Sequence, residues 1–357
     1  MTAYMTSLLA RFVLDSRPAT CERYGCGHIN ETYLVTTHSG RRYILQKINH
    51  NIFPNVPALM ANISAVTDYL RRQTDDPRGV LTLVPTADGA AYEHAADGTY
   101  WRVYVFIEDA LCLQQPEQPQ DFYESAVAFG QFQQQLAQFP AHTLHEIIPN
   151  FHNTPDRYRI FREVLARDPM GRAEGVREEI EFALAHEAEA GTLTALLEAG
   201  KLPLRVTHND TKLNNVMLDR TSRKALCVID LDTVMPGLSL YDFGDSIRFG
   251  ASSAAEDEQD LTKVEMLLDR FQTYTQGFLS ACPGLTQTER DMLPMGAKLM
   301  TLECGVRFLT DYLDGDHYFA THRPGQNLDR ARTQFKLVAD METKWAQMHE
   351  IVQTVHP

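Results

Sequence analysis

The stretch that decides the fold lies past the middle of the chain and reads Leu204-Arg205-Val206-Thr207-His208-Asn209-Asp210-Thr211-Lys212-Leu213-Asn214-Asn215. A short β-favouring run leads into a polar loop, in which Asp210 precedes Asn215 by five residues. A second β-favouring run, Ala225-Leu226-Cys227-Val228-Ile229, ends in Asp230, fifteen residues after Asn215. This order of Asp, Asn and a later Asp is that of a kinase catalytic loop followed by its metal-binding Asp.

The pattern suits phosphoryl transfer for a chemical reason. A hydroxyl nucleophile has to be oriented by a carboxylate, and phosphate oxygens have to be neutralised by a hard cation held by oxygen ligands. Asp210 fits the first task, and Asn215 with Asp230 fits the second. The alternative is that His208 and Asp210 form a structural turn and that Asp230 caps a strand, but the joint spacing favours the kinase interpretation.

The composition bounds the class of protein. The chain has 357 residues, enough for two domains of about 150 residues each. Its 33 Lys and Arg against 47 Asp and Glu give a net charge of −14, which argues against nucleic acid or an anionic membrane as a partner. The N-terminus does not resemble a signal peptide, and the six cysteines form no Cys-x-x-Cys pair. We therefore expect a cytoplasmic enzyme, and we expect a monomer.

The predicted secondary structure changes near Glu108, from mainly strands to mainly helices. Before it, β-favouring runs predict strands, and apolar residues at steps of three or four predict one helix. After it, a Gln- and Pro-rich connection leads into a mainly helical part, interrupted only by the two short runs beside Asp210 and Asp230. The predicted strands are 33–36, 43–46, 81–85 and 101–107, and the predicted helices are 56–72, from 121 onward, 176–199, 299–313 and 335–352.

Taken together, His208-x-Asp210-x4-Asn215 and Ile229-Asp230 resemble the aminoglycoside phosphotransferase/choline kinase branch of the protein-kinase-like enzymes. The segments 242–250 and 303–318 resemble the N-acetylhexosamine 1-kinases of that branch. The resemblance implies an α+β, protein-kinase-like fold of two lobes. Residues 1–108 would form a small nucleotide-binding lobe with an antiparallel sheet, and residues 109–357 a larger, mainly helical lobe that carries catalysis and sugar binding.

The implied reaction is ATP-dependent phosphorylation of the anomeric hydroxyl of N-acetylglucosamine or N-acetylgalactosamine. Asp210 would be the catalytic base, Asn215 and Asp230 would bind Mg²⁺, and Asp232 would support them.

The sequence motif for the nucleotide site is less specific than the motif around Asp210. Tyr24-Gly25-Cys26-Gly27-His28-Ile29-Asn30 suits a glycine loop that lets the backbone approach phosphates, although a plain hairpin turn would also use such residues. Protein kinases carry a lysine on the third strand, and here Gln46 takes that position. Lys47 falls on the opposite face unless a bulge intervenes. At the lobe boundary, Ile107 and Glu108 are expected to offer backbone groups to adenine.

For the sugar, the resemblance implies His28, Phe249, Arg307 and Tyr318. An Arg can donate to hydroxyls or to an acetamide carbonyl, and an aromatic ring packs on the apolar face of a sugar. Other interpretations stay open for several of these residues. Glu303 and Arg307 are spaced for a helical ion pair, and Phe249 could be a core residue. Asp242 and Asp245 could brace the loop after Asp230.

Three other functions are compatible with parts of the pattern. The nearest is a kinase of another small alcohol, such as choline, an amino alcohol or an aminoglycoside; these cationic substrates favour carboxylates and aromatics, and Arg307 argues against them. A nucleotide-binding pseudokinase would lack one of Asp210, Asn215 and Asp230, which are all present. A metal-dependent hydrolase built on Asp210, Asp230 and Asp232 would need more clustered ligands than the spacing supplies.

Overall fold

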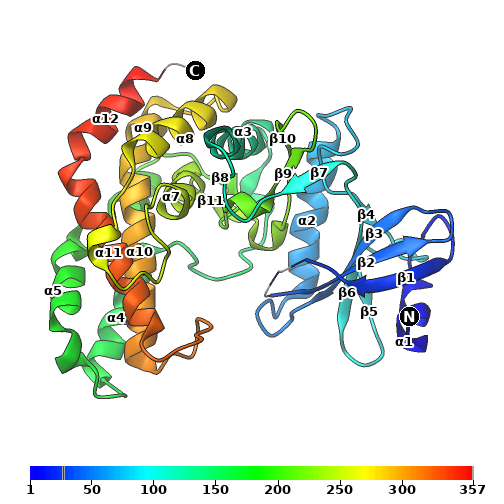
Figure 1. Ribbon diagram of the computed structural model, residues 1–357, viewed down its shortest axis with the longest axis horizontal. Helices are drawn as coiled ribbons and strands as arrows, with labels where there is room; N and C mark the ends of the chain where they lie inside the picture. Colours follow the sequence, from blue (N-terminus) through cyan, green and yellow to red (C-terminus); the bar gives the residue numbers. More distant parts are fainter. Residues whose placement is uncertain (26, 28, 356–357) are drawn as a thin grey trace. The chain divides into compact units, whose positions relative to one another are not determined.

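The computed structural model describes every residue except 26, 28 and 356–357, and it divides the chain into two compact units (Figure 1). The first unit contains 1–111, 142–148 and 217–235, and the second contains 112–141, 149–216 and 236–357. The domain boundary expected from the sequence, at residue 108, places two of these segments, 142–148 and 217–235, in the second domain. In the structure they pack with the N-terminal unit.

An antiparallel sheet forms the first unit, in the strand order β1-β2-β3-β6-β4 with β5 paired to β6. This confirms the predicted N-terminal antiparallel sheet. The first strand was not predicted, because it lies largely exposed and carries no apolar alternation. The strands are β1 (Pro18–Arg23), β2 (Glu31–Thr37), β3 (Arg42–Ile48), β4 (Leu83–Val84), β5 (Glu93–His94) and β6 (Tyr100–Val105).

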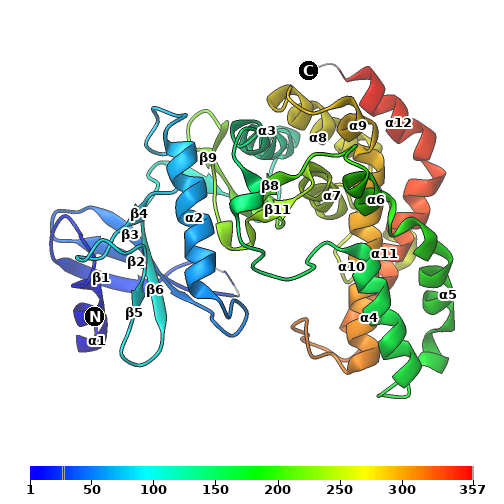
Figure 2. The same cartoon turned by 180° about the vertical axis from the view of Figure 1, so that it is seen from behind.

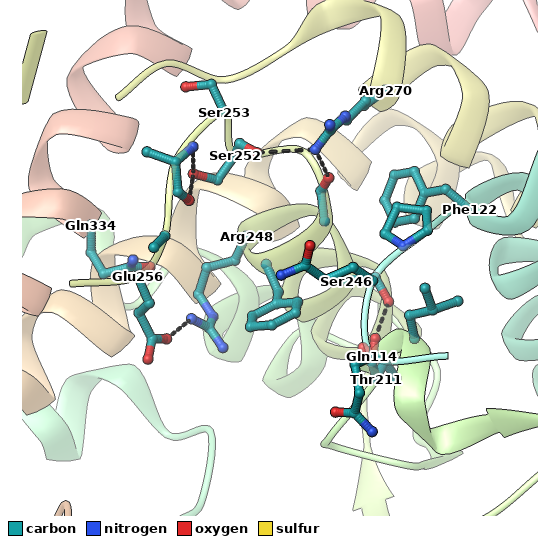
Figure 3. A pocket seen from close by; sticks show the side chains of 17 residues that line it. Gln114, Phe122, Thr211, Ser246, Arg248, Ser252, Ser253, Glu256, Arg270 and Gln334 are labelled. Carbon is teal, nitrogen blue, oxygen red and sulfur yellow. Dashed lines mark hydrogen bonds and ion pairs between the residues drawn. The ribbon is translucent and has the colours of Figure 1, made fainter. Parts of the chain in front are cut away.

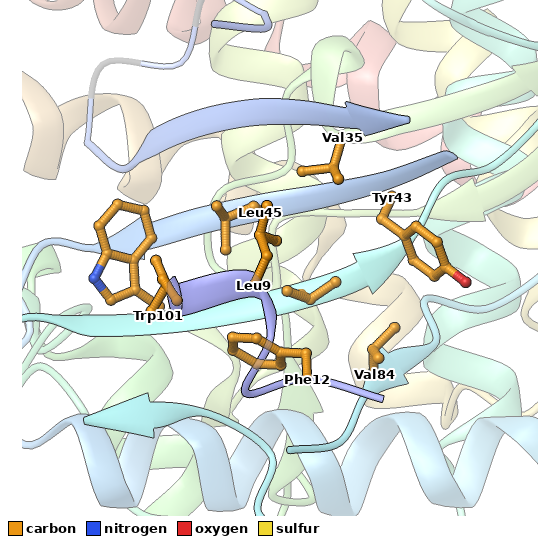
Figure 4. Packing of buried hydrophobic residues seen from close by; sticks show 9 residues of the cluster. Leu9, Phe12, Val35, Tyr43, Leu45, Val84 and Trp101 are labelled. Carbon is orange, nitrogen blue, oxygen red and sulfur yellow. The ribbon is translucent and has the colours of Figure 1, made fainter. Parts of the chain in front are cut away.

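The two faces of this sheet have different partners. One face packs against helix α1 (Ala3–Leu9) around a core that includes Leu9, Tyr43, Leu45 and Trp101 (Figure 4). The other face carries Arg102, whose Nη1 lies 3.9 Å from Sδ of Met60 in helix α2 (Val56–Arg71).

β3 pairs with both neighbours in unbroken register from 42 to 48. No bulge intervenes, so Gln46 points to the face of Arg102 and Lys47 to the face of Trp101.

A smaller sheet of order β10-β9-β7 completes the first unit, with β7 (Ala110–Cys112), β9 (Val216–Asp219) and β10 (Ala225–Val228). Asn62 of α2 ties the two later segments to this unit. Its Nδ2 donates to the carbonyls of His145 (2.8 Å) and Val234 (2.9 Å), and its Oδ1 accepts from the amide of His145 (2.8 Å). One buried amide therefore fixes segments that are far apart in the sequence.

The second unit is mainly helical, as predicted, with one two-stranded sheet of β8 (Arg205–Thr207) and β11 (Met235–Gly237). Helix α10 packs against α4, α7 and α11 (Figures 1 and 2). The helices are α3 (Pro119–Gln135), α4 (Thr154–Arg167), α5 (Arg177–His186), α6 (Thr192–Glu198), α7 (Ser239–Gly250), α8 (Leu268–Ala281), α9 (Gln287–Asp291), α10 (Leu293–Asp314), α11 (Gln326–Thr343) and α12 (Trp345–Thr354).

Three predicted helices differ in detail. The helix expected over 335–352 falls on two helices, the end of α11 and most of α12, which are separated at Lys344. The helix expected from Asp121 begins at Pro119, because the Asp121 carboxylate accepts from the backbone amides of Glu117 (2.9 Å) and Gln118 (3.1 Å) inside the first turn. The helix expected over 176–199 is two helices, and the second of them begins after Gly191. Within the described part of the chain, no helix combines the length and apolar character needed to cross a bilayer.

Candidate active site

The loop after β8 brings together two of the predicted site residues. The Nδ2 of Asn215 donates to Oδ2 of Asp210 at 3.1 Å and to the Asp210 carbonyl at 2.9 Å. The other carboxylate oxygen, Oδ1, lies 2.8 Å from Nζ of Lys212. Asp210 and Asp245 raise the pKa of Lys212, although burial opposes its charge. The loop thus presents a half-buried carboxylate held by one cation and one amide.

The same contacts leave Asn215 suited to a hard cation. Its amide nitrogen is turned to Asp210, so its oxygen is the atom left for a metal, and an amide oxygen is a ligand that Mg²⁺ accepts. Among the residues that the structure describes, no three His, Cys, Asp or Glu side chains form a group that could hold a metal ion. A metal site that includes Asn215 would use an amide oxygen as a ligand, which a cluster of carboxylates or imidazoles does not.

A buried carboxylate on α7 shapes the start of the catalytic loop. The Asp242 oxygens accept from the backbone amides of His208 (2.9 Å) and Asn209 (2.8 Å), and from Nε2 of Gln133 (2.7 Å). Asn209 has a φ of 65°, a left-handed conformation that Asn tolerates better than most residues. Burial raises the pKa of Asp242. His208 is fully buried against Phe129, which fits a structural residue.

A second carboxylate on α7 holds the other side of Asp210. Oδ2 of Asp245 accepts from the amide of Thr211 at 3.0 Å, and Oδ1 accepts from Nε and Nη2 of Arg248 at 3.1 and 2.9 Å. Burial opposes the charge of Asp245, but Arg248, Lys212 and His152 outweigh it and lower its pKa. Asp242 and Asp245 therefore brace the catalytic loop itself, and not the loop after Asp230.

Asp230 belongs to the first unit, whereas Asp210 and Asn215 belong to the second. Asp230 lies two residues after the end of β10, is exposed, and has a left-handed backbone with φ 60° and ψ 59°. Asp232, two residues on, is buried. The two carboxylates of the sequence motif therefore have opposite surroundings.

The predicted glycine loop connects β1 and β2. The amide of Tyr24 donates to the Thr32 carbonyl at 3.0 Å, which closes the connection at its base. Gly25 has a φ of +74°, and among the described residues other than chain neighbours no atom lies within 4 Å of where a Cβ would be at Gly25 or Gly27. The backbone there is open to a ligand. His28, predicted to bind the sugar, lies outside the described residues.

Gln46 is engaged within the first unit. Its Oε1 accepts from Nε of Arg102 at 3.0 Å, and its Nε2 donates to Oγ1 of Thr32 at 3.1 Å. On the opposite face, Nζ of Lys47 lies 3.6 Å from Oε1 of Glu31 and 6.0 Å from the ring centre of Trp101.

At the predicted adenine site, Glu108 accepts from Nε of Arg42 at 3.0 Å. Ile107 and Glu108 help to line a cavity of about 240 Å³ in the first unit. Within the described part of the chain, the backbone N–H and C=O of Ile107 have no hydrogen-bond partner.

The predicted sugar residues Arg307 and Tyr318 contact each other, with Nη2 of Arg307 3.3 Å from the tyrosine oxygen. The guanidinium also lies over the rings of Phe151, Tyr318 and Phe319, at 5.2, 5.6 and 5.4 Å from the ring centres. Glu303 does not pair with it. Its oxygens bind Nδ1 of His152 (2.9 Å) and Oγ1 of Thr154 (2.7 Å).

Phe249 is 43% exposed, so it is not a core residue. It lines a cavity of about 420 Å³ in the second unit together with Thr211, which follows Asp210, and Ser246, whose Oγ donates to the Thr211 carbonyl at 2.8 Å (Figure 3). Arg307 and Tyr318 do not line this cavity. Burial raises the pKa of the Cys304 thiol to about 11, although Arg248, which lines the cavity, and Arg307 both act to lower it.

Two residues of these constellations were missed from the sequence. Lys212 stands inside the quoted motif, two residues after Asp210, and its charge was a usable signal. Arg102 interrupts an otherwise apolar and aromatic strand, and it is 1% exposed. A charge in such a strand predicts a buried partner, but the sequence does not say which residue supplies it.

Comparison with known proteins places this arrangement among the kinase-like folds. A microcompartment-associated aminopropanol kinase is 18% identical, with a TM-score of 0.67 over 97% of this chain and 98% of that one. An aminoglycoside phosphotransferase from Alicyclobacillus acidocaldarius is 14% identical, with a TM-score of 0.62 over 97% and 96%. A spectinomycin phosphotransferase, in complex with ADP and spectinomycin, is 12% identical, with a TM-score of 0.58 over 97% and 98%.

The predicted fold, an antiparallel N-terminal sheet followed by a larger helical part, is therefore that of the kinase-like phosphotransferases. The model of the phosphotransferase enzyme family matches residues 20–277, which is well over half of the chain. The protein belongs to this family.

Proposed function

We propose that this phosphotransferase is an N-acetylhexosamine 1-kinase, which transfers the γ-phosphoryl group of ATP to the anomeric hydroxyl of N-acetylglucosamine or N-acetylgalactosamine. The observation that supports the substrate is Arg307. Its guanidinium lies over three aromatic rings and pairs with no carboxylate in the described part of the chain. A guanidinium that forms no ion pair repels a cationic acceptor, while its N–H donors suit the hydroxyl and acetamide oxygens of a neutral sugar.

Asp210 is the general base in this proposal. Its carboxylate oxygens already accept from Lys212 and Asn215, and each keeps a lone pair for the acceptor hydroxyl. The hydroxyl oxygen forms a bond to the γ-phosphorus as the bond to the bridging oxygen of ATP breaks. The proton passes to Asp210, and ADP leaves. Lys212 stabilises the ionised form of the base until the proton arrives.

Asn215 and Asp230 would hold Mg²⁺, since both offer oxygen ligands suited to a hard cation. When bound, the ion neutralises charge on the phosphate oxygens. The open backbone at Gly25 and Gly27 supports a place for the phosphates in the glycine loop. The backbone groups of Ile107, which have no hydrogen-bond partner among the described residues, support adenine binding at the boundary residues Ile107 and Glu108.

The main alternative is a kinase of an amino alcohol or an aminoglycoside. The similarity to an aminopropanol kinase and to aminoglycoside phosphotransferases favours it. The cavity beside Phe249 does not offer a free carboxylate to an amine, because its Glu256 accepts from Nη1 of Arg248 at 2.6 Å. A pseudokinase would bind nucleotide without turnover.

The test is release of ADP from Mg-ATP with a panel of neutral sugars, amino sugars, amino alcohols and aminoglycosides. We expect turnover with the two N-acetylhexosamines and a product phosphate coupled to H1 in the phosphorus–proton NMR spectrum. Coupling to the two H6 protons, or turnover of amines alone, would contradict the proposal.

The role of Arg307 in sugar binding is tested with one variant and a matched control. Arg307→Ala should raise the sugar KM by about tenfold or more, as expected for the loss of charged hydrogen bonds, and leave the ATP KM nearly unchanged. Arg162→Ala is the control, because Arg162 is exposed and pairs with Glu187 away from these residues. Equal effects on both KM values would make Arg307 a structural residue.

A further inference from the structure

A buried polar network lies on the α2 face of the N-terminal sheet. Asp232, 3% exposed, accepts from Nη1 of Arg102 with Oδ1 and from Nδ2 of Asn30 with Oδ2. Arg102 in turn donates from Nε to Gln46, which donates to Thr32. All five residues belong to the first unit. The network therefore joins the end of the glycine loop, the three strands β2, β3 and β6, and the loop after Asp230.

Each end of this network is itself fixed. Asn30 stands between the glycine loop and β2, and its Oδ1 accepts from the amide of Asn49 at 3.0 Å. Asp232 lies in the turn Leu231–Thr233, directly after the left-handed Asp230. A shift of either loop would break hydrogen bonds to buried charged groups, which is costly in a low-dielectric interior.

The charges in the network explain the glutamine at the lysine position. Gln46 is the cross-strand partner of Arg102, so a cation stands on the same face of the sheet but on the neighbouring strand. The Arg102 side chain is 1% exposed and forms an ion pair with Asp232. Its charge is therefore already neutralised by a carboxylate of the protein. Both oxygens of Asp232 are occupied by protein donors, whereas Asp230 is exposed.

We propose that Asp232 is a positioning residue that locks the Asp230 loop to the glycine loop through Arg102 and Asn30, and that it is not a metal ligand. The proposal rests on the proposed function, in which Asp230 holds Mg²⁺ and the glycine loop holds the phosphates of ATP. Binding of nucleotide at one loop and of the cation at the other then depend on one shared buried carboxylate.

Exchanging the side chains of Asn30 and Asp232 distinguishes a positioning role of Asp232 from a role as a metal ligand. Asn30→Asp sets a carboxylate against Asp232, and Asp232→Asn sets two amide donors against each other and leaves Arg102 without its counter-ion. In the Asn30→Asp/Asp232→Asn double variant, the amide at 232 donates to the carboxylate at 30, Arg102 keeps an acceptor oxygen, and the net charge is restored. Asn51→Asp is the matched control, because Asn51 is an exposed residue near the same end of the sheet.

The measurement is calorimetric binding of ADP at several Mg²⁺ concentrations, together with the melting temperature of each variant without ligand. Each single variant should weaken Mg²⁺-dependent ADP binding by about tenfold or more, and the swap should recover it to within about threefold, as for a coupled pair. Should Asn30→Asp not fold, Asn30→Ser, which removes the hydrogen bond without adding charge, takes its place as the weakened single variant.

Two results would overturn the inference. If the swap binds as weakly as Asp232→Asn alone while its melting temperature is restored, Asp232 is a metal ligand. If Asp232→Asn binds Mg-ADP like the wild type, the carboxylate positions nothing. A wild-type protein that binds no ADP, or binds it equally without Mg²⁺, would instead remove the proposed function on which the inference rests. Turnover of a different alcohol would leave the inference standing.

Discussion

Substitution of Gly244 by Ala tests how far the catalytic loop depends on the crossing of α7 and α10. A Cβ at Gly244 would lie 2.3 Å from the carbonyl oxygen of Gly296, 2.7 Å from its carbonyl carbon and 2.6 Å from Cγ of Met300. Two of these three atoms are backbone, so a rotamer change cannot relieve the contact. The helices would have to separate by about 1 Å to reach ordinary van der Waals distance.

The expected cost follows from two opposing effects. Ala is favoured over Gly inside a helix by about 1 kcal/mol, whereas overpacking a core costs typically about 1 to 3 kcal/mol and sometimes more. Because the contacts at Gly244 are with backbone, we take the upper end, which gives a net loss of about 2 kcal/mol. For a unit of this size that lowers the melting temperature by about 4 to 8 °C.

Activity should fall by more than stability alone requires. Asp242 and Asp245, on either side of Gly244, hold the amides of the catalytic loop. A displacement of about 1 Å at a reacting group can cost about a hundredfold in rate. The assays are thermal unfolding and kcat at a temperature where the variant is folded. Gly175→Ala is the control, because no atom lies within 4 Å of where its Cβ would be. A Gly244→Ala protein with wild-type melting temperature and kcat would refute this reasoning.

Two further changes act on the loop and on its supports. Asp210→Asn should lower kcat by about a hundred- to ten-thousandfold, the usual range for a general base, while calorimetry shows ADP binding unchanged; near-normal turnover would remove Asp210 from this role. Burial opposes the charge of Glu289, but Arg205, whose Nη2 donates to it at 2.7 Å, outweighs burial and holds the pKa of Glu289 below its ordinary value. Because a depressed carboxyl pKa stabilises the fold above the unfolded pKa, this contribution should be lost as the pH falls below about 4. Denaturant titrations of Glu289→Gln should therefore show a stability gap to the wild type at pH 6 that narrows toward pH 3, and a gap that is constant with pH would contradict this.

The part of the site that the sequence predicts is the part built from local contacts. Asp210 and Asn215 are five residues apart, and the amide of one reaches the carboxylate of the other within a single turn of the loop. The strand before this loop and the antiparallel N-terminal sheet were likewise predictable, since alternation and turn residues are local signals. These signals predict a strand-rich part followed by a helical part, and the resemblance carried by the motifs at Asp210 and Asp230 implies the kinase-like fold.

The contacts that the sequence does not predict join distant segments. Helical spacing placed Glu303 and Arg307 within reach of each other, yet the structure gives Glu303 to His152 and Thr154. The reason is burial: Glu303 is fully buried, and a buried carboxylate needs several donors, which the loop and helix start at 152–154 supply. Arg307 is left partly exposed among aromatic rings, an outcome that spacing along one helix could not reveal.

The supports of the catalytic loop also show why its surroundings, and not only its motif, set its geometry. Glu289 binds Arg205 at the start of β8 and accepts from Oγ of Ser239, the first residue of α7, at 2.8 Å. The strand that delivers the loop and the helix that braces it are thus held by the same carboxylate. A loss at Glu289 would remove one of the links between β8 and α7 and leave the hydrogen bonds to Asp242 and Asp245 to hold the loop, even though every residue of the motif remained. In this chain the geometry of the motif therefore depends on the buried carboxylates of Glu289 and Asp242 as well as on the motif residues themselves.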